Sequence, residues 1–381
     1  MKILIIIGTR PEAIKMVALI DKFKKDKFFN FRLCITGQHK EMLNQVLKDF
    51  NIKPDFNLKL MTNDQTLFSI TSGTLCGLEK IFNKFLPDIV LVHGDTISSF
   101  AASLASYFKK LPIGHVEAGL RTNNIYSPWP EEGSRKLTDA LSTIHFAPTS
   151  FAKENLIKEG YKKNSIHITG NTVIDSLFFA KKFISEKKSI LRKLEKKYSI
   201  IDNNKLILVT AHRRENFGKS FENICKALIK ISKRNKDIVI IYPLHPNPNI
   251  KVPAIRHLSK IKNIFLVDPL DYFSFIYLMS KSYLILTDSG GIQEEAPSLH
   301  KPVLVMRDET ERQEATMAGT IKLVGTNTKK IFDNVQLLIN NKKVYNSFIV
   351  KKNPYGNGTA SSKILKILKS KYSFLKNEQL I

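Results

Sequence analysis

The stretch LILTDSGGIQEEAP, residues 284–297, combines an apolar run, a glycine-rich turn and the start of a helix. Leu284–Thr287 predicts a buried strand, and Asp288–Gly291 predicts a sharp turn into the helix. Gly290 and Gly291 lack a Cβ atom, so the chain can turn tightly and bring its N–H groups close to a ligand. N–H groups at a helix start, together with the helix dipole, favour an anion such as a diphosphate. Taken alone, such a turn is more often an ordinary connection of an α/β protein.

The same succession of strand, turn and helix recurs along the whole chain. It begins with the apolar run Lys2–Ile7, continues through Ile113–Val116, and restarts with Lys205–Thr210. Two such series predict an α/β protein with two Rossmann-like, doubly wound parallel-sheet domains that face each other across a cleft. We expect an N-terminal domain over residues 1–170, to which a C-terminal helix at about 365–381 packs back. The second domain is expected over residues 171–364.

Composition narrows the classes of partner. The chain has 381 residues, a formal net charge of +26 and three cysteines, Cys34, Cys76 and Cys225, which form no zinc-binding spacing or disulfide framework. We therefore expect a reducing, cytoplasmic setting and no metal. No apolar run reaches about 18 residues, and no secretion signal opens the sequence, so no membrane segment is expected. The lysines are dispersed and no nucleic-acid motif accompanies them, which favours an anionic small substrate over nucleic acid.

Acidic side chains follow consecutive predicted strands. Asp95 follows the strand Asp88–Val92, and Glu117 follows the strand Ile113–Val116. Glu131 lies at the start of the next helix, after a proline-stiffened loop. Each acid alone is more often a helix cap. Together, at the sheet edge where ligands bind, they predict a site that can move protons.

Cationic side chains occupy the corresponding positions after other strands. Arg10 and Lys15 flank the first turn, while His212 and Arg213 follow the strand Lys205–Thr210, and His245 follows a later one. A single histidine of this kind is more often structural. In combination with the 288–291 turn, these groups predict a site that binds a diphosphate.

Eight ordered motifs resemble those of the non-hydrolysing UDP-N-acetylglucosamine 2-epimerases, and the resemblance extends from Met1 to about Ile367. The motifs are GTRPEAIKM (8–16), TGQHKEML (36–43), VHGDT (92–96), GHVEAGLRT (114–122), YSPWPEE (126–132), ITGNTVID (168–175), AHRREN (211–216) and TDSGGIQEEAP (287–297). The resemblance implies a fold like that of the GT-B glycosyltransferases, and the isomerisation of UDP-N-acetylglucosamine to UDP-N-acetylmannosamine. It implies no nicotinamide, no other cofactor and no metal.

The implied chemistry is elimination followed by re-addition. UDP leaves C1 of the sugar while a base removes the proton from C2, and 2-acetamidoglucal remains bound. UDP then returns, and C2 is protonated from the other face. Asp95, Glu117 and Glu131 are the implied acids and bases, with His212 beside the leaving group; which acid serves which face stays open.

The resemblance also implies substrate contacts. The phosphates are expected at Arg10, Lys15, His212 and the turn Ser289, Gly290 and Gly291. Glu295 is expected at the ribose, Phe275 at the uracil, and Arg135 and Arg312 at the diphosphate or sugar.

A second, activating UDP-N-acetylglucosamine occurs in some members of the family, and the matching positions are Gln38, His39, Arg213 and His245. Gly73 replaces an expected arginine and Glu41 replaces a glutamine of some members, which argues against such activation here. Leu270 replaces a glutamine near the base.

Three functions are therefore compared. The epimerase, supplying N-acetylmannosamine units for surface polysaccharide and forming a homodimer, accounts for the motifs. A hydrolysing 2-epimerase or a GT-B glycosyltransferase using a UDP-sugar is the alternative. A nucleic-acid binder rests on net charge alone.

Overall fold

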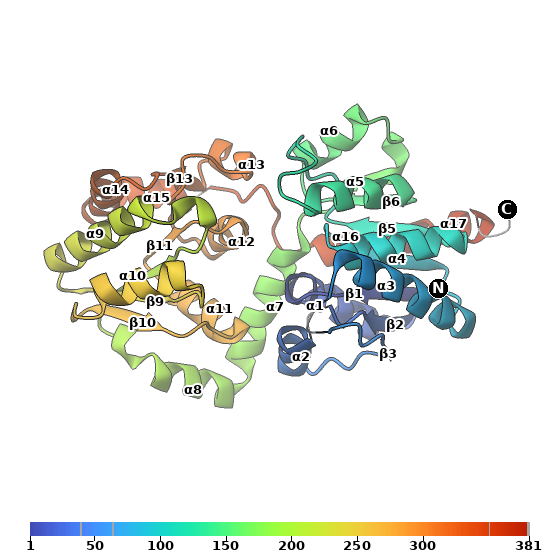
Figure 1. Cartoon of the computed structure of the whole chain (residues 1–381), viewed down its shortest axis with the longest axis horizontal. Coiled ribbons are helices and arrows are strands. Elements are labelled where there is room, and N and C mark those ends of the chain that lie inside the picture. Colours follow the sequence, from blue (N-terminus) through green and yellow to red (C-terminus); the bar gives the residue numbers. More distant parts are fainter. Residues whose placement is uncertain (39, 63–64, 350, 379–381) are drawn as a thin grey trace. The chain divides into compact units, whose positions relative to one another are not determined.

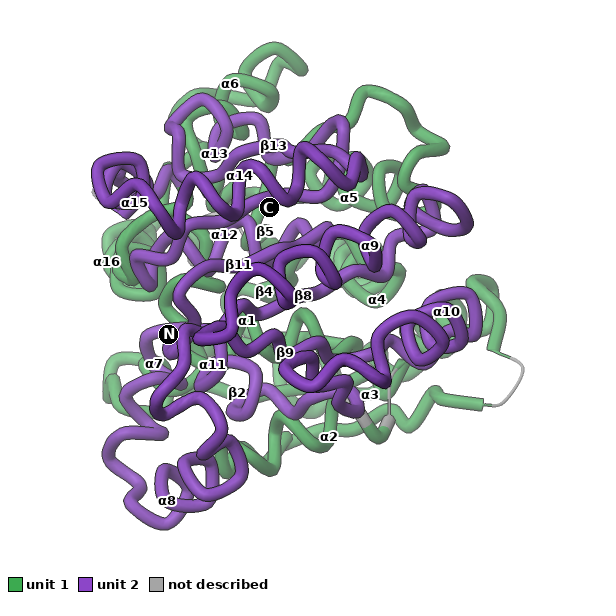
Figure 2. The backbone as a smooth tube through the Cα atoms, turned by 90° about the vertical axis from the view of Figure 1, so that its left-hand side faces the viewer, with its two compact units in different colours: residues 1–176, 355–381 green, residues 177–354 purple. Residues whose placement is uncertain are grey.

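The computed structural model describes residues 1–38, 40–62, 65–349 and 351–378 (Figure 1). The chain forms two compact units, which Figure 2 distinguishes by colour. Unit 1 comprises Met1–Ser176 and Tyr355–Ile381, and unit 2 comprises Leu177–Pro354.

Unit 1 contains a seven-stranded parallel sheet with the strand order β3-β2-β1-β4-β5-β6-β7. Its strands are β1 (Lys2–Ile7), β2 (Asn30–Ile35), β3 (Phe56–Asn57), β4 (Ile89–His93), β5 (Ile113–Val116), β6 (Ile144–Ala147) and β7 (Ile166–Ile168). Strand β1 is buried from Ile3 to Ile7, as expected for a central parallel strand that is covered on both faces.

The helices of unit 1 form two layers. Helices α3, α4 and α5 pack in sequence in one layer, and α2, α1 and α16 pack in the other (Figure 1). The elements are α1 (Arg10–Lys25), α2 (Lys40–Asp49), α3 (Leu67–Lys84), α4 (Ile97–Phe108), α5 (Glu131–Leu141), α6 (Ser150–Lys158), the 3₁₀ turn η1 (Lys163–Ser165), α16 (Ala360–Ser370) and α17 (Tyr372–Glu378). Helix α1 begins with a capping box, in which Thr9 accepts from the Glu12 backbone while the Glu12 carboxylate accepts from the Thr9 N–H at 2.7 Å.

Unit 2 contains a six-stranded parallel sheet with the order β10-β9-β8-β11-β12-β13. The strands are β8 (Lys205–Thr210), β9 (Ile238–Pro243), β10 (Ile264–Val267), β11 (Leu284–Thr287), β12 (Val303–Val305) and β13 (Ile321–Leu323). Both sheets therefore have the doubly wound topology that the repeated pattern predicts.

Helix α7 (Thr172–Glu186) begins in unit 1 and continues into unit 2. Within unit 2, helix α9 packs between α10 and α14 over a core built from β8, β9 and β11 (Figure 1). The remaining elements are α8 (Lys188–Lys197), η2 (Ser199–Ile201), η3 (Arg214–Asn216), α9 (Lys219–Arg234), α10 (Pro248–Leu258), α11 (Tyr272–Lys281), α12 (Gly290–Glu295), η4 (Ala296–Leu299), α13 (Gln313–Met317), α14 (Thr328–Asn340) and α15 (Lys342–Ile349).

The C-terminal segment returns to unit 1. The carboxylate of Asp175 accepts hydrogen bonds from the backbone N–H groups of Ala360 (3.0 Å) and Ser361 (2.8 Å), which are the first residues of α16. Lys369, near the end of α16, pairs with Asp26 at 2.6 Å. Across the described residues, no helix combines the length and apolar character needed to cross a bilayer.

Candidate active site

Each sheet has one point where the strand order reverses, and ligands of doubly wound proteins bind beyond the carboxyl ends of the strands at that point. In unit 1 it lies between β1 and β4, and the following turns carry Arg10 and Asp95. In unit 2 it lies between β8 and β11, and the turns carry His212 and the segment 288–291. The sequence-predicted residues therefore occur at both switch points.

Glu117 accepts hydrogen bonds from two side chains of unit 1 and lies near a third. Lys15 donates to its carboxylate at 2.6 and 2.7 Å, Asn171 donates at 2.8 Å, and the ring of His93 lies 3.7 Å away. The Glu117 side chain is only 6% exposed. Its backbone has φ = +70°, a left-handed conformation that costs a non-glycine residue energy and is concentrated at functional sites. Lys15, expected at the phosphates, thus contacts one of the expected acids; its role toward phosphate stays a prediction.

His93 lies beneath this acid as a neutral base. Burial lowers the pKa of His93 to about 4, although the Glu117 carboxylate acts in the opposite direction. An uncharged imidazole does not compete with Lys15 for the negative charge of Glu117.

Asp95 makes an ion pair with Arg135, a residue of α5. Arg135 also donates to Glu132 at 2.9 Å, and Glu132 accepts from the backbone N–H groups of Thr122 and Asn123 at 3.1–3.2 Å. The arginine is thereby fixed between the turn after β4 and the loop before α5. Arg135, expected at the diphosphate or sugar, lies beside an expected acid.

Glu131, the first residue of α5, is half-buried. Its Oε2 atom is buried without a hydrogen-bond partner among the residues that the structure describes. Because a buried carboxylate oxygen normally has a donor, this atom is suited to a polar group of a ligand.

A buried glutamate joins the two turns at the unit 1 switch point. Glu12 accepts from the backbone N–H groups of Gly8 (3.0 Å) and Thr9 (2.7 Å), and from the hydroxyls of Thr96 (3.0 Å) and Ser99 (2.8 Å). Burial raises the pKa of Glu12, and these hydrogen bonds oppose that effect. The sequence analysis did not find this role, because it depends on a contact between residues more than 80 positions apart.

Asp288 has the role in unit 2 that Glu12 has in unit 1. Its Oδ2 atom accepts from the backbone N–H groups of His212 and Arg213, both at 2.8 Å, and from the Asn216 amide at 3.1 Å. The His212 ring stands 3.4 Å from the other carboxylate oxygen and is stacked on His245, with ring centroids 5.6 Å apart. Burial lowers the pKa of His212, although Asp288 opposes this. The structure thus brings the predicted pair of histidines together.

The turn after β11 leads directly into α12. Ser289 is the N-cap residue, and its side chain makes no capping hydrogen bond. The helix start is therefore suited to an external anion. A Cβ atom on Gly290 would lie 2.9 Å from a carboxylate oxygen of Glu311, so a larger residue there would displace the end of that side chain.

Three further predicted residues, Arg312, Glu295 and Phe275, belong to unit 2. Arg312 pairs at 2.5 Å with Glu294, a carboxylate that is 1% exposed, while Glu295 lies next in the helix. Phe275 is half-buried in the first turn of α11. Their expected contacts with substrate stay predictions.

Of the expected effector residues, Gln38 accepts from the Ser98 hydroxyl at 2.8 Å, and Arg213 pairs with Glu311 at 3.2 Å. His39 lies outside the described residues. At Gly73 in α3, an added Cβ atom would lie 2.8 Å from the Leu60 side chain.

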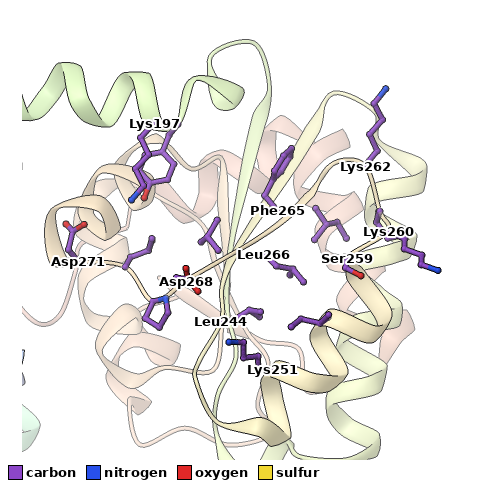
Figure 3. Close-up of a pocket in the computed structure, with 17 residues that line it drawn as sticks. Lys197, Leu244, Lys251, Ser259, Lys260, Lys262, Phe265, Leu266, Asp268 and Asp271 are labelled. Atoms are coloured by element: carbon purple, nitrogen blue, oxygen red, sulfur yellow. The ribbon is translucent and has the colours of Figure 1, made fainter.

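A hollow of about 800 Å³ lies beside the edge strand β10 (Figure 3). It is lined by Phe265 and Leu266 of β10, by the following loop up to Asp271, and by lysines such as Lys251 and Lys260. The phosphate candidates are absent from its lining. None of the predicted site residues lines it, and we do not assign the substrate to it.

Comparison with known proteins gives a consistent result. The profile of a protein family described as UDP-N-acetylglucosamine 2-epimerase matches residues 21–369. A UDP-N-acetylglucosamine 2-epimerase of Campylobacter jejuni is 53% identical over 371 residues, covering 96% of this chain and 97% of the relative. The enzyme of the same name from Yersinia pestis is 51% identical, with coverages of 97% and 99%. The crystal structure of UDP-GlcNAc 2-epimerase from Neisseria meningitidis bound to UDP-GlcNAc has a TM-score of 0.89 and 48% identity, and covers 97% of this chain and all of that one.

Proposed function

The chain belongs to the UDP-N-acetylglucosamine 2-epimerase family, and we propose that it interconverts UDP-N-acetylglucosamine and UDP-N-acetylmannosamine without hydrolysing them. The observation that carries this proposal is the pairing of two of the three expected acids with a cation, Glu117 with Lys15 and Asp95 with Arg135. Carboxylates fixed in this way at a switch point can take and return a proton.

The reaction begins with elimination. The bond between C1 and the β-phosphate oxygen breaks, and UDP leaves with the bonding electrons. A carboxylate of unit 1 removes the C2 proton, and the C1–C2 double bond of 2-acetamidoglucal forms. Re-addition reverses these steps, except that a second acid delivers the proton to the opposite face of C2. Atoms and electrons balance, and no outside oxidant or reductant is consumed.

We assign the diphosphate to the turn 289–291 and to His212 of unit 2. The helix start and an imidazole beside it stabilise the negative charge that develops on the departing UDP. Asp288 supports this assignment, because it fixes the backbone of His212 through a hydrogen bond. The ribose is assigned to Glu295 and the uracil to Phe275.

We assign the exchange of the C2 hydrogen to Asp95, Glu117 and Glu131 of unit 1. The first two are paired with cations, whereas an oxygen of the third is buried without a partner in the described chain. The three carboxylates thus have different hydrogen-bonding surroundings, which suits a reaction with separate acid and base steps.

The test is incubation with UDP-N-acetylglucosamine alone, in heavy water and without NAD. We expect UDP-N-acetylmannosamine that carries deuterium at C2, with free UDP far below one equivalent per turnover. Product without deuterium would exclude the elimination, and UDP released in step with turnover would favour the hydrolysing alternative.

Four further assignments rest on family membership: the oligomeric state, the compartment, the use of the product and an effector site. We propose a homodimer in the cytoplasm whose product supplies N-acetylmannosamine units for surface polysaccharide. Light scattering checks the dimer. If an effector binds at Gln38, His39, Arg213 and His245, the rate should depend sigmoidally on the concentration of UDP-N-acetylglucosamine. A hyperbolic dependence would contradict this effector site.

A further inference from the structure

His115, the third residue of β5, lies in the core of unit 1 with 0% of its surface exposed. Its Nδ1 atom is 2.6 Å from Oδ1 of Asp139 on α5, and its Nε2 atom is 2.7 Å from the carbonyl oxygen of Gly94. Gly94 immediately precedes Asp95. One side chain therefore connects a buried carboxylate to the turn that carries an expected acid.

Both ring nitrogens of His115 act as donors. The carbonyl of Gly94 can only accept, so Nε2 carries a proton. Asp139 accepts a further hydrogen bond from Arg121 at 2.8 Å and one from the Gly119 N–H at 3.3 Å. Burial alone would raise the pKa of Asp139, but His115 and Arg121 outweigh it and lower that pKa to about 2. Asp139 is thus a carboxylate, and Nδ1 donates to it.

Both backbone polar groups of Gly94, its N–H and its carbonyl, are held by hydrogen bonds. The Gly94 N–H donates to the carbonyl of Val116 at 2.9 Å, while the Gly94 carbonyl accepts from His115. Gly94 has φ = +69°, so the chain reverses at this residue, and the orientation of the next side chain depends on how firmly the turn is held. Both restraints come from β5, the strand that ends at Val116, immediately before Glu117.

We propose that His115 is a positioning residue, whose hydrogen bond to the Gly94 carbonyl orients Asp95 for proton transfer at sugar C2. The proposal rests on the proposed function, since it takes Asp95 as an acid or base of that reaction. A misplacement of about 1 Å in a reacting group can cost on the order of 10²-fold in rate. The effect is therefore expected in kcat rather than in substrate affinity.

Two conservative variants separate the two bonds. In His115→Gln the amide nitrogen takes the place of Nε2 and can still donate to Gly94, but not to Asp139. In His115→Asn the amide nitrogen takes the place of Nδ1 and keeps the bond to Asp139, but not the bond to Gly94. Each variant loses one buried hydrogen bond. The bond lost in His115→Gln is the one to a buried carboxylate, so His115→Gln is expected to be no more stable than His115→Asn, and lower stability alone cannot explain a lower kcat of the asparagine variant.

We expect His115→Asn to lower kcat by about 100-fold and His115→Gln by about 10-fold, with KM within threefold of the parent. Equal losses of kcat in the two variants, or a higher kcat in His115→Asn than in His115→Gln, would overturn the proposal. Either result would mean that His115 has only a structural role. Hydrogen exchange of the peptide spanning residues 93–96 is the second readout. It should be faster in His115→Asn than in His115→Gln, and the reverse order would also overturn the proposal.

His145 provides the matched control. It lies on β6 directly opposite His115 in the sheet register, is equally buried, and bonds to the main-chain carbonyl of Asp139 at 2.9 Å. His145→Gln should lower the melting temperature but leave kcat within threefold. If the parent protein makes no UDP-N-acetylmannosamine, the proposed function fails first, and the exchange measurement alone then decides whether His115 holds the turn.

Discussion

Removal of the Lys15 ammonium should destabilise unit 1 through the carboxylate that it leaves behind. Lys15 and Glu117 approach to 2.6 Å, and their side chains are 17% and 6% exposed. Breaking a buried ion pair by removing one partner costs about 3–5 kcal/mol. The Asn171 amide still donates to Glu117 at 2.8 Å, and Lys15 is slightly exposed, so we place Lys15→Met near the lower limit, at about 3 kcal/mol.

Replacing the glutamate instead of the lysine should cost less stability. In Glu117→Gln, the lysine that loses its partner can extend into solvent, which limits the loss to about 1 kcal/mol. The double variant contains neither charge, so its loss should be about 2 kcal/mol instead of the additive sum. The coupling energy is then about 2 kcal/mol, which corresponds to about 4–8 °C for a domain of this size.

Scanning calorimetry of the four proteins measures this coupling, provided that the transition of unit 1 is followed separately. The surface pair Lys25–Asp21 is the control, because its lysine side chain is 71% exposed. Lys25→Met should change stability by less than about 0.5 kcal/mol. Additivity of Lys15→Met and Glu117→Gln within about 0.5 kcal/mol would show that the carboxylate does not depend on Lys15, and would refute the reasoning.

Three shorter predictions concern activity, pH and backbone conformation. Asp95→Asn and Glu117→Gln should each lower turnover by about 100-fold while UDP binding, measured by calorimetry, stays within threefold; a loss of UDP affinity with a normal saturated rate would contradict the assigned roles. The pKa of His93 is about 4 in the folded chain and about 6.5 when unfolded, so the unfolded state binds the proton first, and stability should fall by up to about 3 kcal/mol as pH drops from about 6.5 to 4. In His93→Gln, the free energy of unfolding measured with urea should change less with pH over that window. An unchanged dependence of stability on pH would show that another group causes it. Gly119→Ala should destabilise unit 1 by more than about 3 kcal/mol, because φ is +84° and the new Cβ atom would lie 2.3 Å from a backbone oxygen of α6; Gly160→Ala, with φ = +89° and open space, should cost only about 1 kcal/mol.

The sequence predicts much of the fold because the strands are short, apolar and regularly spaced. Strands Ile113–Val116 and Lys205–Thr210 are predicted at their observed bounds. Helix α5 begins at Glu131, the residue that the sequence analysis places at a helix start. Helix α10 (Pro248–Leu258) was not predicted, since it contains Pro253, and an interior proline normally breaks a helix.

Partners across the fold could not be predicted from sequence. Lys15 and Glu117 are 102 positions apart, and His115 and Asp139 are 24 apart. A pattern can place a charged residue at the carboxyl edge of a sheet, but it contains no information about which side chain from another strand will neutralise it. For this reason the contact between Lys15 and Glu117 was not predicted, while the expected contact of Lys15 with phosphate stays a prediction.

At both switch points, a buried carboxylate accepts hydrogen bonds from the backbone of the turn. A turn between a parallel strand and its helix exposes successive N–H groups that need acceptors. In unit 1 Glu12 accepts from Gly8 and Thr9, and in unit 2 Asp288 accepts from His212 and Arg213. A buried carboxylate therefore holds each turn from inside the protein.

This arrangement has a consequence for catalysis. In each turn the acceptor lies inside the fold, so the backbone is held without help from a ligand. In unit 2 this fixes the backbone of His212, so the proposed role of that residue beside the diphosphate requires little reorganisation of the turn. Replacing Asp288 by a residue that cannot accept two hydrogen bonds would therefore affect the position of His212 before it affected its charge.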